Sequence, residues 1–313
     1  MSARMGVVLV TYNSQADIAA CLNSLNAADI AMQIVVVDNA STDGTIAKVQ
    51  ASKQALTLLK MPQNIGFAAG VNQGLAYLMQ NPALDRFWVL NPDSTCTAST
   101  PRALATHPEP FALLGCRITY ADPADQIQID AGTVNWWTGA TGNMGLGCAA
   151  TRPPPDMTKA DFISGASMVA SRAFIEAAGP MPEDYFLYYE EVDWAMRRGD
   201  LPLAFCDDAR VFHAAGASIG SPTLARGPSE VSTYFKHRAR LRFIARFNPV
   251  ALPVAYLFGW AKIMQSLSRG QWRSAMSALR AIHGLRPSAV VRAAIGESAQ
   301  AKAKSRRVRT KLS

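Results

Sequence analysis

The sequence is poor in cysteine and in charged side chains. Only five of its 313 residues are cysteines, and they are scattered with no C-x-x-C pair: Cys21, Cys96, Cys116, Cys148 and Cys206. This spacing argues against a structural zinc site or a disulfide framework and suits reduced thiols in a cytosolic protein. Charged residues make up 17% of the chain and hydrophobic residues 49%, which predicts a globular core rather than disorder.

Two familiar nucleotide-binding motifs are also missing. The chain contains no G-x-x-x-x-G-K-[ST], which excludes a P-loop, and no G-x-G-x-x-G turn. Gly66, Gly70 and Gly74 are instead spaced by four, which suits close packing of a helix. A nucleotide would therefore have to be held by acidic and amide side chains together with a metal ion.

Acidic residues are scarce in the C-terminal part. Residues 226–313 hold 18 Lys and Arg against Glu230 and Glu297, a net charge of +16, whereas residues 1–225 hold 13 bases and 21 acids, a net charge of −8. A strongly basic segment fits nucleic acid or an anionic membrane surface. No nucleic-acid recognition motif accompanies it, and the acidic remainder would repel phosphates, so we expect no nucleic-acid partner.

The longest apolar run of this basic part, residues 251–261, would span about 17 Å as a helix. That is shorter than the hydrocarbon core of a bilayer, about 30 Å, so we do not expect a transmembrane helix. Val254, Leu257 and Met264 share one helical face, with Phe258 and Ala261 beside them. Such a helix either lies in a membrane interface or docks on the rest of the protein, and the two are compatible.

The first hundred residues alternate between strand and helix patterns. Short continuous apolar runs at 6–12, 33–39, 56–61 and 86–91 are typical of strands buried on both faces. A helical pattern follows the first run. A second helix is predicted after the second run, with Ser41 or Thr42 as its N-cap, and a third covers much of residues 64–79. This alternation predicts a largely parallel, doubly wound α/β sheet.

Ligands of such sheets bind at the carboxyl ends of the strands. Polar side chains stand where these strands end, and we expect them to converge on one crevice: Thr11, Tyr12, Asn13, Asp38, Asn39, Asn91 and Asp93.

Six segments occur in an order and at spacings that resemble family 2 inverting glycosyltransferases, and within them the bacterial rhamnosyltransferase-like subgroup. They are VVLVTYNS, IVVVDNASTDGT, NIGFAAGVNQGL, VLNPDS, the stretch from FISGAS to EVDWAMR, and VFHAAGAS. The resemblance covers about residues 5–245. It implies a GT-A type nucleotide-diphospho-sugar transferase fold, a Rossmann-like mostly parallel sheet extended by a smaller mixed sheet, here followed by a C-terminal helical segment.

The resemblance also implies a donor site. Asp38 matches a carboxylate that accepts hydrogen bonds from the nucleobase or ribose, although a turn or helix cap would explain an Asp here as well. Thr11, Tyr12 and Asn13 match a loop that cups the base largely through its backbone. Asn64 and Gly66 either contact the nucleotide or form a simple turn.

A divalent cation, Mg²⁺ or Mn²⁺, can neutralise the charge on a departing diphosphate. In NPDS, Pro92 favours an extended turn that presents Asp93 at a strand end as a metal ligand, with a structural Asx-turn as the alternative. The family pattern is often D-x-D, and Asn91 replaces its first acid, which keeps an oxygen ligand but loses a charge. His213 matches a further metal ligand of some relatives, with a structural strand-end histidine as the alternative.

The segment YFLYYEEVDW, residues 185–194, places three carboxylates at the start of a predicted helix. The helix dipole favours ionised acids there, so stability alone explains one or two of them. In the resemblance Glu191 matches the general base that deprotonates the acceptor hydroxyl. Asp193 is expected to pair with Arg197 in a structural or acceptor-orienting role. Glu190 is the third candidate of the cluster.

Two further segments carry expectations about the sugars, one about the acceptor and one about the donor. NWWTGATGNMGLG, residues 135–147, predicts a hairpin in which at least one tryptophan fills the core, or alternatively a loop on which sugar rings stack. FISGAS, residues 162–167, places small residues before a buried strand and would allow close approach of the donor sugar.

The family resemblance, together with these patterns, predicts a GT-A catalytic domain over residues 1–225, with a nucleotide-sugar half at about 1–95 and an acceptor half at about 96–225. A basic helical segment at 226–300, a candidate for contact with a membrane surface, and a disordered tail at 301–313 follow. The resemblance implies transfer from a nucleotide-diphospho-sugar to a lipid-linked or oligosaccharide acceptor at the inner face of a bacterial cytoplasmic membrane. The resemblance to the subgroup is the sole reason to favour dTDP-rhamnose over UDP-hexose as the donor. The alternatives are a non-catalytic nucleotide-sugar-binding protein and a sugar-phosphate nucleotidylyltransferase.

Overall fold

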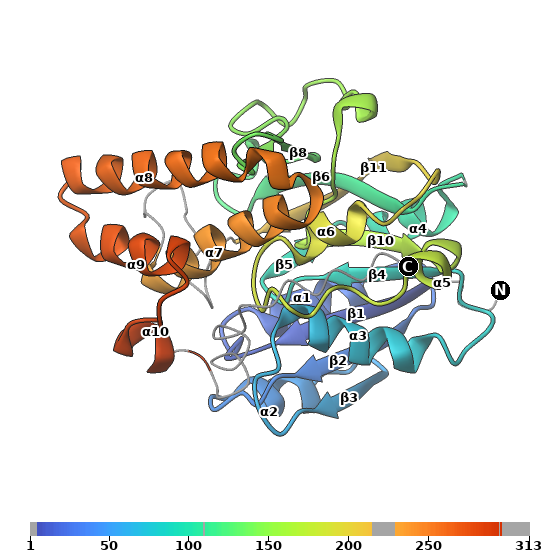
Figure 1. The fold of residues 1–313 in the computed structure, drawn as a ribbon. Coiled ribbons are helices and arrows are strands. Elements are labelled where there is room, and N and C mark those ends of the chain that lie inside the picture. Colours follow the sequence, from blue (N-terminus) through green and yellow to red (C-terminus); the bar gives the residue numbers. More distant parts are fainter. Residues whose placement is uncertain (1–4, 109, 215–228, 294, 296–313) are drawn as a thin grey trace.

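The computed structural model describes residues 5–108, 110–214, 229–293 and 295, which form a mixed β-sheet flanked by helices on both faces and a cluster of C-terminal helices (Figure 1). The predicted disordered tail, residues 301–313, lies outside the described residues. The main sheet has the strand order β3-β2-β1-β4-β10-β6-β11-β5, with β7 paired to β6.

The first half of the sheet is entirely parallel. It consists of β1 (Met5–Thr11), β2 (Gln33–Asp38), β3 (Leu56–Lys60) and β4 (Arg86–Leu90). Strands β1, β2 and β4 are almost wholly buried, because helices cover both faces of this half. The four predicted strands are confirmed to within one or two residues.

The second half of the sheet is mixed. Strand β10 (Ser167–Ser171) runs antiparallel between β4 and β6 (Leu113–Tyr120), and β11 (Leu203–His213) runs parallel to β6. Shorter strands complete it: β5 (Ser94–Cys96) beside β11 and β7 (Ile127–Ile129) beside β6. A separate hairpin pairs β8 (Gly132–Val134) with β9 (Thr141–Asn143).

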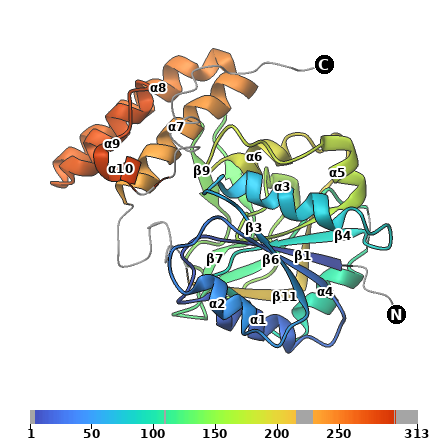
Figure 2. The ribbon, with the colours of Figure 1, turned by 90° about the horizontal axis from the view of Figure 1, so that it is seen from below.

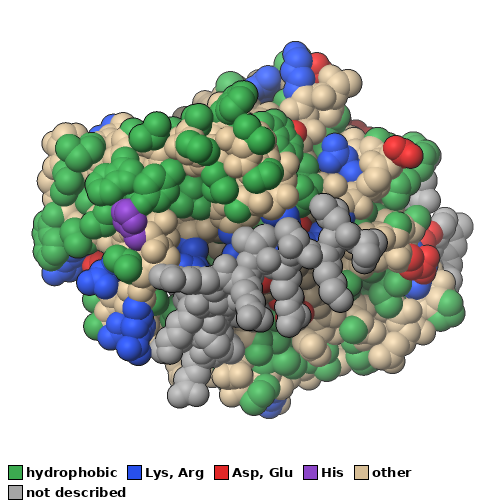
Figure 3. Space-filling model, in the orientation of Figure 1, with side chains coloured by type: hydrophobic (Ala, Val, Ile, Leu, Met, Phe, Trp, Pro, Cys, Tyr) green, Lys and Arg blue, Asp and Glu red, His purple; other side chains and the backbone are tan. Residues whose placement is uncertain are grey.

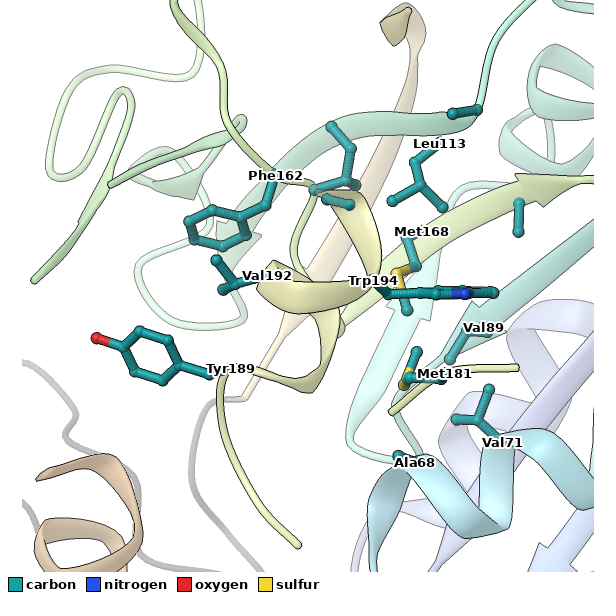
Figure 4. Packing of buried hydrophobic residues seen from close by; sticks show 14 of the residues in the cluster. Ala68, Val71, Val89, Leu113, Phe162, Met168, Met181, Tyr189, Val192 and Trp194 are labelled. Atoms are coloured by element: carbon teal, nitrogen blue, oxygen red, sulfur yellow. The ribbon is translucent and has the colours of Figure 1, made fainter. Parts of the chain in front are cut away.

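Helices sandwich this sheet (Figure 2). One face carries α1 (Ile18–Asn26), α2 (Thr45–Gln50) and α4 (Thr100–Thr106), and the other carries α3 (Phe67–Leu78), α5 (Arg172–Ala178) and α6 (Glu190–Ala195). The indole of Trp194 fills the core under α6 between Met168 and Met181 (Figure 4). Its Nε1 donates to the carbonyl of Gly179 at 2.9 Å, so the ring is fixed by a polar contact as well.

The glycines of α3 allow this helix to lie close to the sheet. A Cβ built on Gly70 would lie 2.7 Å from Cγ1 of Val10, and one on Gly74 would lie 2.5 Å from Cγ1 of Val8. Neither separation is tolerated by real side chains, so only glycine fits at this helix–sheet distance. The expectation of close helix packing is confirmed.

Four C-terminal helices follow β11: α7 (Glu230–Phe247), α8 (Leu252–Ser268), α9 (Trp272–Ile282) and α10 (Ala289–Ala293). Helix α7 packs against both α8 and α9 and carries the side chains that join the helical cluster to the rest of the protein. Two short 3₁₀ helices, Met157–Lys159 and Pro249–Ala251, lie in the connections.

The predicted cap of the second helix is wrong. Helix α2 begins at Thr45 rather than after Ser41 or Thr42, and no side chain caps it. The hydroxyl of Ser41 instead donates to Asp38 at 2.6 Å, and the backbone N–H of Thr42 donates to Asn13 at 2.9 Å. Both residues are engaged by the neighbouring strand ends, which the local sequence pattern does not reveal.

Candidate active site

A cavity opens at the carboxyl ends of β1 and β4. Its lining mixes polar strand-end residues with an apolar wall: Val10, Thr11, Tyr12, Ser14, Asn39, Asn64, Gly66, Phe67, Asn91, Pro92, Asp93, Phe186, Leu187, His213, Val231 and Ile295. Seven of the predicted donor and metal residues are therefore brought together here. The C-terminal helical part closes one side, through Val231 of α7 and Ile295.

Two predicted donor residues do not line this cavity. The Asp38 carboxylate is buried and accepts hydrogen bonds from the Thr11 hydroxyl at 2.9 Å and from the backbone N–H of Ser41 at 2.9 Å. Asn13 has a left-handed backbone, with φ of 51°, and its side chain holds Thr42. In this structure both residues shape the loops that border the cavity.

The strongest polar feature of the cavity is the pair formed by Asp93 and His213. Nε2 of His213 lies 3.1 Å from Oδ1 of Asp93 and 3.3 Å from Nδ2 of Asn91. On the other side of the ring, Nδ1 lies 2.6 Å from Oε1 of Gln128, and an amide oxygen only accepts, so Nδ1 carries a proton. In the neutral ring the lone pair of Nε2 then points toward the carboxylate.

Electrostatics keep Asp93 ionised. Burial alone would raise the pKa of its carboxyl, but the positive charge of a protonated His213 ring and a hydrogen bond from its Nε2–H bring the pKa below the usual value for aspartate. A carboxylate oxygen and a neutral imidazole nitrogen that meet at a cavity wall are donors that suit a divalent transition metal. Within the described residues no group of three or more His, Cys, Asp or Glu side chains gathers as a complete cation cage.

Asp17, just before α1, is a nearby carboxylate that sequence reasoning missed. Burial raises its pKa, and the negative charge of Asp93 raises it further. The residue therefore lies within electrostatic reach of the Asp93–His213 pair. Its position in the TYNSQAD loop, directly after the first strand, is the sequence feature that could have identified it.

The segment over the cavity has an unusual backbone. Phe186, Tyr188 and Tyr189 have φ values of 72°, 68° and 70°, a left-handed region that non-glycine residues seldom adopt. A Cβ on Gly66, whose φ is 93°, would lie 3.0 Å from the Phe186 ring. Three strained residues in four are typical of segments with a functional constraint.

Immediately after this segment, α6 begins with the predicted acidic cluster. Glu191 is half-buried, and burial raises the pKa of its carboxyl to about 7, although the positive charge of Lys236 on α7 opposes the rise. A Cβ built on Gly165 would lie 3.9 Å from Cβ of Glu191 and 3.4 Å from the ring of Phe67, which lines the cavity. Glu191 therefore adjoins the cavity across the FISGAS segment.

The small residues of that segment lie where they were expected. They precede β10, which is buried at all five positions, and the carbonyl of Ala166 accepts the backbone N–H of Asn91 at 2.9 Å. The chain that leaves β4 through Asn91 and the chain that enters β10 after Gly165 therefore meet at one point of the sheet edge.

Asp193 has a different environment from Glu191. It is fully buried and pairs with Arg197 at 2.9 Å, with the Tyr185 hydroxyl at 2.8 Å and with Arg246 of α7. The predicted pairing with Arg197 is confirmed. Glu190 is buried as well.

The tryptophan hairpin differs from expectation. Strands β8 and β9 do form a hairpin, but neither indole fills the core, because Trp136 is 37% exposed and Trp137 is 59% exposed. Trp136 rests one face on Phe243 of α7, with ring centroids 5.7 Å apart. The hydroxyl of Tyr189 donates to the carbonyl of Gly139 at 2.6 Å, so this loop borders α6.

Comparison with known proteins gives these observations a context. Residues 6–123 match the family model described as Glycosyl transferase family 2. A curated relative, the low-salt glycan biosynthesis hexosyltransferase Agl10 of Haloferax volcanii, is 23% identical over 215 residues, which are 67% of this chain and 66% of that protein. The match thus spans just under two thirds of the relative's length.

Solved structures share the fold. The mannosyltransferase PcManGT from Pyrobaculum calidifontis, in complex with GDP-Man and Mn²⁺, matches with a TM-score of 0.54 at 16% identity, over 89% of this chain and 87% of that one. GalNAc-T7 with UDP, GalNAc and Mn²⁺ matches with a TM-score of 0.55 at 12% identity, over 80% of this chain and 51% of that one. S. aureus TarS 1–349 in complex with UDP-GlcNAc matches with a TM-score of 0.52 at 17% identity, over 93% of this chain and 84% of that one. The predicted GT-A type fold is confirmed.

Proposed function

We propose that this chain, which carries a match to glycosyl transferase family 2 over residues 6–123, is an inverting glycosyltransferase. The observation that carries the proposal is the placement of Glu191 beside the cavity that contains Asp93 and His213. A base with a pKa of about 7 next to a site for a diphosphate and its cation is what sugar transfer to a hydroxyl requires.

The nucleotide-diphospho-sugar would occupy the cavity. Thr11, Tyr12, Asn39 and Asn64 offer backbone and side-chain groups for the nucleoside, with Asp38 supporting the Thr11 side of the site. Structural relatives were solved with GDP-Man, with UDP and with UDP-GlcNAc, which supports a nucleotide-sugar donor. The subgroup resemblance favours dTDP-rhamnose among these donors.

A divalent cation fits the same cavity. Asp93 and His213 would hold it, with the oxygen of Asn91 near them, and Mn²⁺ accompanies the nucleotide or nucleotide sugar in two of the structural relatives. A bound cation stabilises the negative charge that develops on the departing diphosphate.

The protein's own groups supply the proton transfer. The acceptor hydroxyl attacks the anomeric carbon, a new carbon–oxygen bond forms as the bond to the diphosphate breaks, and the hydroxyl proton passes to Glu191. Attack from the face opposite the leaving group inverts the anomeric centre. Asp193, held by three partners, positions α6 rather than taking the proton.

The acceptor is proposed to be a sugar on a lipid carrier, reached at the inner face of the cytoplasmic membrane. The curated relative is a hexosyltransferase of glycan biosynthesis, which agrees with polysaccharide assembly. The basic C-terminal helices supply the membrane contact.

The proposal is tested by thermal-shift titration of the full chain with dTDP, UDP and GDP and their sugars, each with Mn²⁺, with Mg²⁺ or with chelator. We expect one nucleotide series to raise Tm by mass action, and the rise to require a cation. Asp93→Ala should abolish the cation-dependent part and most turnover while the protein stays folded. An unchanged cation-dependent shift in that variant, or full transfer activity in excess chelator, contradicts the assignment.

A further inference from the structure

We propose that the outward face of α8, together with the tryptophan loop 135–140 and the start of α9, is a docking surface for an anionic lipid bilayer. The proposal deepens the function proposed above. It rests on that function only where it names a lipid-linked acceptor as the molecule that the docked protein would reach. It identifies the residues of the surface and its position relative to the active site.

Helix α8 leaves most of its large apolar side chains exposed. Its buried residues, on the side that packs against α7 and α9, are Ala255, Gly259 and Ile263, two of which are small. In contrast, Leu257 is 68% exposed and Met264 is 60% exposed. The helix therefore presents more apolar surface outward than its contacts within the protein use.

The outward apolar residues recur at helical spacing from the 3₁₀ turn before α8 to the last turn of α8: Val250, Val254, Leu257, Trp260, Met264 and Leu267. Hydrophobic side chains gather over α8 in the space-filling view and continue toward the hairpin region (Figure 3). An apolar stripe of this extent is atypical of a solvent-facing helix in a monomeric protein and marks an interaction surface.

The surface is extended at the start of α8 by the tryptophan loop. The side chain of Asn248 donates to the carbonyl of Trp136 at 2.9 Å, which fixes this loop beside the 3₁₀ turn that precedes α8. The guanidinium of Arg240 on α7 donates both to the carbonyl of Thr138 and, at 2.8 Å, to the carbonyl of Ala255. Loop and helix are thus held as one unit by α7, with the exposed ring of Trp137 at its edge.

The surface is extended at the end of α8 by Trp272 and Met276 of α9, of which Trp272 is 62% exposed. Arg269 and Arg273 are exposed at the same turn, and the Arg273 guanidinium lies 5.5 Å from the Trp272 ring centroid. Tryptophan beside arginine is typical of protein surfaces at the level of lipid headgroups.

The charge of this part of the chain favours an anionic bilayer as the partner of the surface. Residues 231–293 contain no Asp or Glu but two Lys and nine Arg. An apolar stripe bordered only by cations is complementary to anionic headgroups over acyl chains, and each nearby base contributes about 1 kcal/mol to such an attraction. A second copy of this chain would bring the same positive charge and would be repelled.

The helix is expected to lie in the bilayer interface rather than to cross it. Residues 249–268 are long and apolar enough to span a membrane by length and composition alone, with 22% of that stretch buried in the protein. Its buried side is already occupied by α7 and α9, and the Arg240 guanidinium is bonded to its backbone. Only the outward face is free to enter lipid, which is the geometry of an interfacial helix.

This placement brings the active site to the bilayer. The loop 135–140 is bonded to Tyr189, which stands two residues before Glu191. An enzyme that docks through this surface would receive a hydroxyl from a lipid-anchored acceptor close to the proposed base.

The test is co-sedimentation of the full chain with vesicles of phosphatidylcholine containing about one third phosphatidylglycerol, and with vesicles of phosphatidylcholine alone. We expect binding to the anionic vesicles, weakened at least about tenfold by the double substitution Leu257→Glu and Met264→Glu. Both side chains are exposed, so the fold should survive. The matched control is Val290→Glu, an equally exposed apolar residue on α10, which should bind like the unchanged protein.

Three results would overturn the proposal: no binding by the unchanged chain, equal binding by the double variant, or loss of binding by Val290→Glu alone. Light scattering adds a fourth, a dimer that the double substitution dissociates, which would make the surface a protein interface. Nucleotide-induced stabilisation is measured on the same samples and should be unaffected by the double substitution. The docking proposal and the proposed function can therefore fail separately.

Discussion

At the scale of single residues, Glu191 and Glu190 separate two explanations of the acidic cluster. If Glu191 is the base, Glu191→Gln should lower turnover by about 10²–10⁴-fold with donor binding nearly intact. Glu190→Gln should cost far less, because Glu190 is buried at the start of α6 and is not the matched base. Steady-state transfer rates and donor titrations of both variants test this assignment. A larger loss of turnover in Glu190→Gln than in Glu191→Gln would make Glu190 the base.

The raised pKa of Glu191 adds a pH dependence with a definite sign. A general base works only when ionised, so kcat/KM should fall as the pH drops through about 7. For stability the sign is opposite. A carboxyl whose folded pKa lies above its unfolded value destabilises the folded state once it is ionised, fully above pH 7 and not at all below about 4.5. Glu191→Gln should therefore raise the free energy of unfolding at pH 8 more than at pH 5, by roughly 1–2 kcal/mol.

At the scale of elements, the buried carboxylate of Asp193 on α6 is neutralised in part by Arg246 of α7. Asp193 has no exposed surface, and Arg246 of α7 reaches both Asp193 and Asp184, the latter at 2.6 Å. Arg246→Ala would leave this buried carboxylate with a reduced set of partners, and removal of one partner from a buried ion pair costs about 3–5 kcal/mol. Since Asp193 keeps Arg197 and the Tyr185 hydroxyl as partners, we expect the lower part of that range.

Urea denaturation measures this effect, and Arg197→Ala is the matched control. Arg197 pairs with the same carboxylate, but its side chain is 37% exposed, so its loss should cost under about 1 kcal/mol. Because Arg246 also fixes the helix that carries Glu191, its substitution should lower turnover with little change in nucleotide affinity. Equal destabilisation by the two substitutions would show that α7 does not support α6.

The elements also show what local sequence patterns can and cannot predict. The four parallel strands were predicted because continuous apolar runs such as Val7–Leu9 are needed where helices cover both faces of a sheet. The start of α2 was mispredicted because Ser41 and Thr42 bond to residues about 30 positions away or to a strand end. The exposure of Trp137 depends on how α7 and α8 pack, which hydrophobicity alone does not encode.

The candidate site likewise contains residues that sequence motifs could suggest and residues that only the folded structure reveals. Asn91, Asp93 and Glu191 stand in motifs whose order along the chain resembles a family, so the sequence was sufficient to propose them as site residues. Gln128 and Asp17 act through geometry, one by fixing the His213 ring and the other by electrostatic proximity to Asp93, and neither belongs to a motif. The positive φ values at Phe186, Tyr188 and Tyr189 are likewise a property of the folded chain.

At the scale of the whole molecule, the charge asymmetry predicts a salt effect that depends on the acceptor. Among the described C-terminal residues, only Val231 and Ile295 line the cavity, so none of the described bases does, although Lys236 is close enough to Glu191 to oppose the rise in the pKa of its carboxyl. Attraction between exposed charges is screened beyond about 10 Å at 0.1 M salt. On anionic vesicles, kcat/KM for a lipid-linked acceptor should fall at least about tenfold between 0.05 and 0.5 M salt. The rate with a water-soluble acceptor should change by less than about twofold, and equal losses for both acceptors would place the salt effect in the active site.

The antiparallel insertion of β10 has a consequence for how the ligand edge of the sheet is built. A parallel neighbour of β4 would bring its final residues to the ligand edge, whereas β10 brings the chain that enters it, and Ala166 meets Asn91 there. The segment leading into β10 and the loops after β1 and β4 are thus independent stretches of polypeptide that share one edge. A change in the length or sequence of the segment before β10 therefore leaves the loops after β1 and β4 unaltered, so the two sides of this edge can be varied separately.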